Sequence, residues 1–435
     1  MTDLRNKFLE SVDKLFERRQ FQSLKELFDT MEPVDIAEIL AEKAAPERAF
    51  LFRLLPKDLA VDVFEFMEGS EREEMLAGFT DTEVASIIEA MSDDDRTALF
   101  DELPAQTVTK LLSHLSAEER KLANTLLNYP ADSAGHIMTP EFIDLKEGMT
   151  VAQAIDRIRA TAARKETIYT SFVLGPDRRL KGTVSLEDLI LAAPETPLTA
   201  LVDGNPVFVA TSTDQEEAAK TMSRYDLQTL PVVDKEERLV GILTFDDILD
   251  IVQEEATEDF ERMAGIRPVE EGYMDAGVVM LARKRLTWLL VCIVTQLFSS
   301  TILERYTFAL ESMVALAFFI PLLIGTGGNA GSQTTSTIIR ALAVGDIDLG
   351  DALHTLWHEL RVGLLLGVGM ALVAYGRALT WGSSAALAAT VSLAILTIVI
   401  WANLLGSVLP LLASDAYHRG HWRNRPKHGW AKLFA

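Results

Sequence analysis

Carboxylates crowd one short stretch of the chain. Seven of the fourteen residues from 246 to 259 are acidic, namely Asp246, Asp247, Asp250, Glu254, Glu255, Glu258 and Asp259. Their spacings of three and four place them on shared faces of a helix, where like charges destabilise one another. Bound divalent cations or a basic partner would relieve that repulsion, and an ordinary solvated acidic helix face is the alternative.

A second segment with the residue types for ion chemistry lies between residues 321 and 333. It holds clustered glycines and two amides inside an uncharged run, namely Gly325, Gly327, Gly328, Asn329 and Gln333. The glycines predict a broken helix whose backbone carbonyls, together with the amides, line an ion path. Magnesium suits such a lining because it gives up its water reluctantly. Close helix packing through glycine is the alternative.

Long uncharged runs must position this segment. They cover residues 286–303, 312–339, 362–376 and 378–414. Because a membrane span needs roughly 20 apolar residues, we predict four spans, with Arg361 and Arg377 snorkelling beside the third. The basic residues 283–285 before the first span place the amino terminus in the cytoplasm. Glu311 then lies at the outer end of the second span, where it attracts cations or is simply solvated.

Charge is divided unevenly along the 435 residues. Residues 1–275 hold 57 acidic and 29 basic residues, a net charge of −28, whereas the rest of the chain carries +5. Such an acidic portion repels nucleic acid, so we expect no nucleic-acid partner. The single cysteine, Cys292, cannot form an internal disulfide. We find neither a nucleophile with a neighbouring base nor a phosphate loop, so nothing in the sequence indicates an enzyme.

Short helices in series are predicted for residues 1–127. Apolar residues recur at helical spacing in residues 36–40, 59–67, 84–91 and 108–115. Between these stretches lie prolines and three capping-box patterns, which begin at Thr80, Ser92 and Ser116. Repeated short helices separated by prolines and helix caps predict a small helical solenoid that buries its core between neighbouring helices.

An internal repeat marks the next segment. Residues 180–190 align with residues 239–249 at a constant offset of 59, each copy reading as a strand followed by a capped helix. A helix (151–160; 215–222) and an apolar strand (170–174; 229–233) precede each copy. This arrangement resembles a tandem pair of CBS domains, α/β modules that commonly bind adenine nucleotides or ions. Ser185 and Asp188 match the pattern that holds a nucleotide ribose, so ATP or another adenine nucleotide is a candidate ligand; an N-cap is the alternative.

The order of the motifs resembles the MgtE family of magnesium channels. Residues 129–140, reading YPADSAGHIMTP, precede the paired CBS modules, and residues 325–333, reading GTGGNAGSQ, follow them. The resemblance covers residues 1 to about 412. It implies a multidomain membrane protein with an all-α superhelical N domain, an α/β CBS pair and an α-helical transmembrane bundle. It also implies a homodimer in the bacterial plasma membrane that conducts magnesium.

The resemblance gives the carboxylates a role. In that family the helical domain and the CBS pair form a magnesium-responsive cytoplasmic gate, and a connecting helix plugs the pore. Magnesium bound to residues 246–259 would then close the gate. Further candidate ligands are Asp214, Glu216 and Asp226 around the second CBS helix, and Asp94 and Asp95, with Asp93, in the N domain. Because magnesium accepts few direct carboxylates, we expect water-mediated sites shared between domains.

We expect five segments along the chain: a helical N domain (1–130), the CBS pair (131–252), a connecting helix and linker (253–282), the pore domain (283–413) and a basic tail (414–435). The tail departs from the family pattern, because no apolar run follows Leu412 to form the family's fifth span with its membrane-buried aspartate. Asp415 lies near that position. A non-conducting membrane-anchored sensor of magnesium or nucleotide is therefore the alternative function.

Overall fold

The computed structural model describes residues 2–67, 69–269, 276–308, 314–344 and 346–421. The chain divides into two compact units, residues 1–252 and residues 253–435. The boundary lies inside one helix, α14 (Phe245–Met263), which begins at the end of the second CBS module. Glu311 and residues 422–435 of the basic tail lie outside the described residues.

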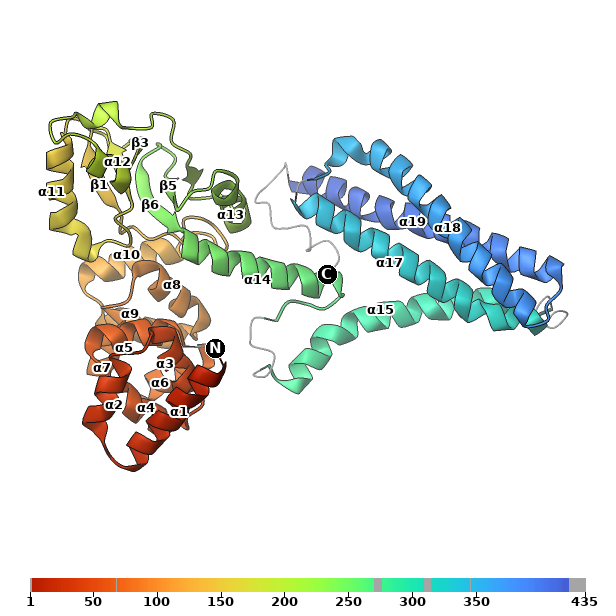
Figure 1. Cartoon of the computed structure of the whole chain (residues 1–435), viewed down its shortest axis with the longest axis horizontal. Helices are drawn as coiled ribbons and strands as arrows, with labels where there is room; N and C mark the ends of the chain where they lie inside the picture. The colour runs from red at the N-terminus through yellow and green to blue at the C-terminus, as the bar shows by residue number, and fades with distance from the viewer. Residues whose placement is uncertain (1, 68, 270–275, 309–313, 345, 422–435) are drawn as a thin grey trace. The chain divides into compact units, whose positions relative to one another are not determined.

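Ten short helices begin the first unit, which confirms the predicted solenoid (Figure 1). They are α1 (Thr2–Glu17), α2 (Phe21–Phe28), α3 (Pro33–Ala41), α4 (Ala45–Phe52), α5 (Lys57–Glu65), α6 (Gly69–Gly78), α7 (Asp81–Ile88), α8 (Asp93–Glu102), α9 (Ala105–His114) and α10 (Ala117–Leu127). Side chains cap α7, α8 and α10, because Thr80, Ser92 and Ser116 each accept a hydrogen bond from the amide three residues on.

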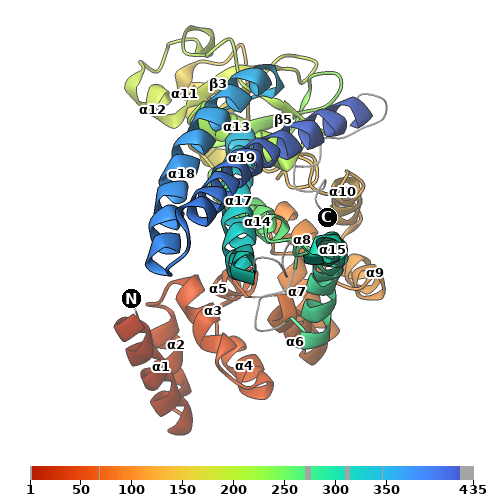
Figure 2. The ribbon, with the colours of Figure 1, turned by 90° about the vertical axis from the view of Figure 1, so that its right-hand side faces the viewer.

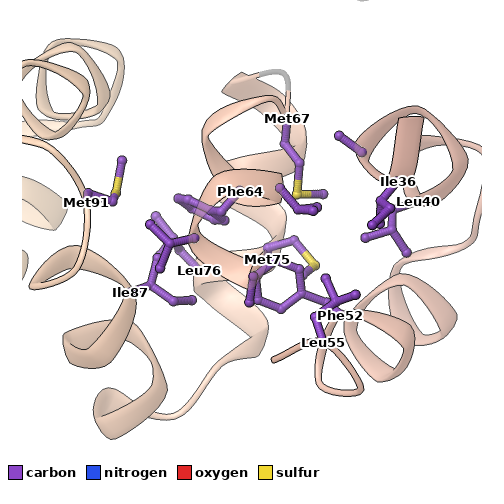
Figure 3. Close-up of a cluster of buried hydrophobic side chains, with 14 of the residues drawn as sticks. Ile36, Leu40, Phe52, Leu55, Phe64, Met67, Met75, Leu76, Ile87 and Met91 are labelled. Atoms are coloured by element: carbon purple, nitrogen blue, oxygen red, sulfur yellow. The ribbon is translucent and has the colours of Figure 1, made fainter. Parts of the chain in front are cut away.

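One apolar core runs through this stack of helices. Phe64 on α5 is fully buried, and Phe52, Met75 and Ile87 come to the same core from α4, α6 and α7 (Figure 3). The Phe52 and Phe64 rings meet edge to face with their centroids 6.3 Å apart. Since each helix is too short to be stable alone, packing against its neighbours supplies most of the stability.

The two CBS modules have the same sheet topology, which confirms the repeat. In each three-stranded sheet the central strand pairs parallel with one neighbour and antiparallel with the other. The first module contains β1 (Ile143–Lys146), α11 (Val151–Thr161), β2 (Thr170–Leu174), β3 (Leu180–Ser185) and α12 (Leu186–Leu191). The second contains β4 (Val209–Ala210), α13 (Gln215–Arg224), β5 (Thr229–Val233), β6 (Leu239–Thr244) and the start of α14.

The segment before the first module packs onto the second. Thr139 exchanges backbone hydrogen bonds with Ile242 on β6, with N···O distances of 2.9 Å in both directions. A Cβ atom at Gly241 would lie 2.5 Å from the Met138 sulfur, so this approach requires glycine. The motif at residues 129–140 therefore ties the helical stack to the second CBS module.

Within the described part of the second unit, four helices are long and apolar enough to cross a membrane, as predicted. The helices are α15 (Val278–Arg305), α17 (Ile320–Val344, preceded by a 3₁₀ turn over Val314–Phe319), α18 (Ala352–Thr380) and α19 (Ala385–His421). Figures 1 and 2 both show α17, α18 and α19 side by side. Phe319, Ala374, Ala378 and Val391 share a core at one end of this bundle.

The predicted break at the glycine segment is wrong. Helix α17 continues through residues 325–333 without interruption. A Cβ atom at Gly327 would lie 2.7 Å from the Ile398 side chain, and one at Gly406 of α19 would lie 2.8 Å from the Gly331 carbonyl oxygen. Gly331 and Gly406 bring the two helix backbones together and Gly327 makes room for Ile398, so this part of the segment shows the close helix packing that was the alternative.

Candidate metal-sensing and ion-path sites

Acidic side chains from the helical stack and the second CBS module gather in the first unit. Ser92 caps α8, and its hydroxyl donates to the Asp95 carboxylate at 2.6 Å. Asp94 lies in the first turn of α8, and its Oδ1 atom is buried without a hydrogen-bond partner. Asp247 lies in the first turn of α14 and accepts a hydrogen bond from Thr244, which precedes that helix.

Burial and mutual repulsion raise the pKa values of this group. The pKa of Glu65 is raised to about 8, that of Glu166 to about 7 and that of Asp247 to about 6, and burial is the largest cause of each shift. The charge of Asp95 contributes to all three. Burial and then the charge of Asp247 raise the pKa of Asp94 well above its usual range. These carboxylates therefore resist ionising together.

Sequence reasoning missed Glu65 and Glu166. Glu65 ends α5, and Glu166 precedes β2, so neither belongs to an acidic run. Packing brings both near the predicted Asp95, and it brings Glu166 near Asp247 as well. No local signal in the sequence marks either residue, because single acidic residues at helix ends are common on solvated surfaces.

The donor set fits a hydrated divalent cation better than a directly ligated one. Carboxylates suit magnesium, and the orphaned Asp94 Oδ1 atom is a buried acceptor in need of a partner. Among the described residues, however, no three His, Cys, Asp or Glu side chains lie close enough to hold one metal ion directly. Since magnesium keeps several waters, binding through its hydrate is compatible with this wider spacing.

The other predicted ligands in the first unit are dispersed or paired. Asp93 is buried and forms an ion pair with Arg96. Asp214 caps α13 by accepting from the Glu216 amide at 3.1 Å, while the Glu216 carboxylate pairs with Lys220 at 2.7 Å. Three others, Asp226, Asp246 and Asp250, are exposed.

The remaining acidic residues of α14 belong to the second unit. Glu254 is exposed and Glu255 is half-buried on this helix. Glu258 forms an ion pair with Arg262. A cavity of about 480 Å³ is lined by Asp259 and Arg262 together with the glycine segment at Gly327 and Gly328. Asp259, one of the predicted metal ligands, therefore lines the same cavity as the glycine segment of the predicted ion path.

One face of α17 carries a polar stripe. Gly325, Gly328, Asn329 and Gln333 are exposed at spacings of three and four, and nothing lies within 4 Å of a Cβ built at either glycine. The opposite face packs on α19, where Thr335 donates to the Gly406 carbonyl at 3.1 Å. Exposed amides on a membrane helix need water or a protein partner, because lipid cannot bond to them.

The candidate nucleotide residues form a helix cap. Ser185 accepts from the Asp188 amide at 3.0 Å and donates to the Asp188 carboxylate at 2.6 Å. Both residues belong to the first CBS module. A cavity of about 1080 Å³ opens elsewhere on this module, beside Phe142, Lys146, Lys165 and Arg178.

A helical stack and a CBS pair, followed by four apolar helices long enough to cross a bilayer, define a multi-pass membrane protein with a large extramembrane portion. The family descriptions that match are "MgtE intracellular N domain" at residues 31–132, "CBS domain" at residues 134–195 and 199–254, and "Divalent cation transporter" at residues 320–420. The chain is 37% identical over 413 residues to magnesium transporter MgtE of Thermus thermophilus, covering 94% of this chain and 91% of that protein.

Similarity extends to a second relative and to solved structures. Magnesium transporter MgtE of Bacillus subtilis is 30% identical over 90% of this chain and 87% of its own length. The cytosolic domain of the Mg²⁺ channel MgtE in complex with ATP has a TM-score of 0.54 at 34% identity, covering 56% of this chain and 99% of that one. The soluble part of a magnesium transporter has a TM-score of 0.55 at 28% identity, with coverage of 58% and 99%. The chain therefore belongs to the MgtE family of divalent cation transporters, which is not a class of enzymes.

Proposed function

We propose that this protein carries magnesium across the bacterial plasma membrane along the polar face of α17. The observation that carries this proposal is the exposed stripe of Gly325, Gly328, Asn329 and Gln333. A stripe of amides and open backbone in an apolar helix is costly against lipid and useful along a water-filled path. Membership of a divalent cation transporter family supports the same function.

A homodimer would complete this path. Within the described residues, the helices of one chain cover the Gly331 face of α17 and leave the Asn329 face open. A second copy placed against the open face would enclose the stripe by symmetry, with identical residues facing one another.

Magnesium on the extramembrane side would close the protein. Glu65, Asp94, Asp95, Glu166 and Asp247 repel one another when ionised, which favours separation of the helical stack from the CBS pair. A hydrated magnesium ion among them cancels that repulsion and holds the two parts together. Residues 254–259 connect this event to the ion path through α14. Closure can respond to cellular magnesium only if the acidic portion lies in the cytoplasm. The basic residues 283–285 before the first span favour that orientation.

ATP is a candidate second ligand. A relative's cytosolic domain binds ATP, and Ser185 with Asp188 is the pair on which we base the same proposal for this chain. Calorimetric titration with ATP tests it, and we expect Asp188→Ala to weaken binding while Asp156→Ala, on α11 of the same module, leaves it unchanged.

Uptake by proteoliposomes tests the transport function. We expect the full chain to admit magnesium, measured with an indicator inside the vesicles, and Asn329→Leu to reduce uptake by about tenfold or more because it removes a polar group from the path. Leu365→Ala, at an exposed apolar position of α18, is the matched control. Magnesium-dependent protease protection of the acidic portion without any uptake would favour the non-conducting sensor instead.

A further inference from the structure

Three helices of the membrane bundle each contribute one polar side chain to the same point. Thr334 on α17 donates to Glu359 Oε2 on α18 at 3.5 Å, and Asn403 Nδ2 on α19 donates to the same oxygen at 3.4 Å. Thr334 is 6% exposed, Asn403 is 1% exposed and the Glu359 side chain is 12% exposed. We call Thr334, Glu359 and Asn403 the three-helix cluster.

The three-helix cluster lies inside the spans. Thr334 is eight residues from the end of its span at Leu342, Glu359 is seven residues from the start of its span at Ala352, and Asn403 is nine residues from the end of its span at Leu412. At about 1.5 Å per residue these positions are roughly 10–14 Å deep. Ionisable residues at such depth are costly and usually mark an ion site.

Glycine brings the helices close enough to build the cluster. A Cβ atom at Gly363, one turn after Glu359, would lie 3.2 Å from the Asn403 Cβ atom. A Cβ atom at Gly406, nearly one turn after Asn403, would lie 3.2 Å from the Thr334 Cβ atom. Both approaches fix the side-chain positions through backbone packing, so the cluster is held from three sides.

The hydrogen bonds within the three-helix cluster are long and leave one buried polar atom without a partner. Bonds to a carboxylate usually measure about 2.7–2.9 Å, and these are longer by half an ångström or more. The Asn403 Oδ1 atom is buried with no hydrogen-bond partner, although the same amide faces the carboxylate. A buried acceptor without a donor is costly.

A cation accounts for both features. Around an ion with oxygen distances of about 2.3–2.6 Å, neighbouring ligand oxygens lie roughly 3.3–3.7 Å apart, which matches the 3.5 Å between Thr334 Oγ1 and Glu359 Oε2. The donor set is one carboxylate, one hydroxyl and one amide oxygen, all of which suit hard cations. Glu359 Oε1 also lies 3.8 Å from the His358 ring, so the second carboxylate oxygen is not buried in apolar surroundings.

We propose that Glu359, Asn403 and Thr334 bind a partly hydrated divalent cation within the membrane bundle, at a site separate from the polar stripe of α17. Asn403 turns its amide oxygen toward the ion when it binds. The spacing accommodates Ca²⁺ directly and Mg²⁺ when some of its ligands are water.

Labelling with dicyclohexylcarbodiimide, an apolar reagent for carboxyl groups, tests this site in the full chain. The modified fraction of Glu359 is measured by peptide mass spectrometry during titration with MgCl₂, CaCl₂ or NaCl at constant ionic strength. We expect Mg²⁺ or Ca²⁺ to protect Glu359 and Na⁺ not to. Asn403→Ala should raise the half-protecting concentration about tenfold or more, and Thr397→Val, on the same helix, should not.

Three outcomes overturn the proposal: no protection of Glu359 by either divalent cation, equal protection by Na⁺, or an unchanged midpoint in Asn403→Ala. The last outcome would mean that the cation acts from a distant site. A second measurement counts bound Mn²⁺ per chain by electron paramagnetic resonance. We expect Glu359→Gln, which keeps the shape of the side chain, to bind one ion fewer than the wild type and than Thr397→Val. An equal count would also overturn the proposal.

Discussion

The charge of Asp247, at the start of α14, raises the pKa of Asp94 on α8, although about 150 residues separate the two in the sequence. The helical stack and the CBS pair therefore bring like charges together at this point, and these charges repel one another. A structure that holds such groups together gains stability from protons or cations bound there.

The pH dependence of stability follows from the raised pKa values. An acid whose pKa is higher in the folded state binds more protons when folded. Its contribution to stability is complete below its unfolded pKa, near 4, and is lost as pH rises through its folded pKa. That loss begins near pH 4 and is complete at about pH 6 for Asp247, about pH 7 for Glu166 and about pH 8 for Glu65, so Glu166 and Glu65 account for the part above pH 6. In chelator we therefore expect the thermal midpoint of the acidic portion to fall between pH 6 and pH 8.

Magnesium should remove most of that fall, because it replaces the protons that leave. Differential scanning calorimetry of the full chain at both pH values, with chelator or with millimolar MgCl₂, measures the effect. Equal magnesium stabilisation at pH 6 and pH 8 would contradict a carboxylate site of this kind.

Removing one charge should mimic the cation. Asp247→Asn keeps a hydrogen-bond acceptor for Thr244 while it removes the charge that acts on Asp94. We expect this variant to unfold at a higher temperature than the wild type in chelator at pH 8, and to gain less from magnesium. The matched control is Asp156→Asn, which alters an exposed aspartate of α11 paired with Arg159. If both variants respond to magnesium like the wild type, Asp247 is not part of the site.

The fold was largely predictable from sequence because its signals are local. Thr80, Ser92 and Ser116 cap helices where the pattern places them, and the repeat at residues 180–190 and 239–249 folds as two equivalent strand and helix units. The membrane helices follow from length and hydropathy alone. Each of these inferences needs only neighbouring residues.

The sites were less predictable because they depend on contacts between distant segments. Glu65 joins the acidic group only where α5 comes near Asp95 of α8, and Glu166 only where the segment before β2 comes near Asp247 of α14. The glycines of α17 suggested a broken helix, yet the helix continues; Gly327 and Gly331 pack closely on α19, whereas Gly325 and Gly328 stay open. Glycine propensity cannot distinguish the two outcomes, since both require the absence of a side chain.

His136 gives a second pH effect, which is separable from the first. Its Nε2 atom pairs with Asp101 of α8, and this hydrogen bond raises the pKa of His136. A raised histidine pKa contributes stability below its unfolded value, near 6.5, and loses it as pH rises through the folded value. We expect Asp101→Asn to lower the thermal midpoint at pH 6 more than at pH 8.5, with no change in the response to magnesium. A loss that is independent of pH would contradict the ion pair.

Close packing of α17 on α19 predicts an asymmetry between two glycines. A Cβ atom at Gly406 would lie 2.8 Å from the Gly331 carbonyl, whereas nothing lies within 4 Å of one at Gly376 on α18. We expect Gly406→Ala to destabilise the bundle by about 1–3 kcal/mol and Gly376→Ala to leave its stability unchanged or slightly higher. Reversible unfolding in mixed detergent measures the difference. Equal effects of the two substitutions would show that the helices do not approach this closely.

Hydrogen exchange of the full chain in lipid, compared between chelator and millimolar magnesium at pH 8, tests the central claim most directly. We predict that magnesium slows exchange in the peptides that contain Asp94, Glu166 and Asp247, and that Asp247→Asn removes most of this difference. Identical exchange in these peptides with and without magnesium would contradict the account.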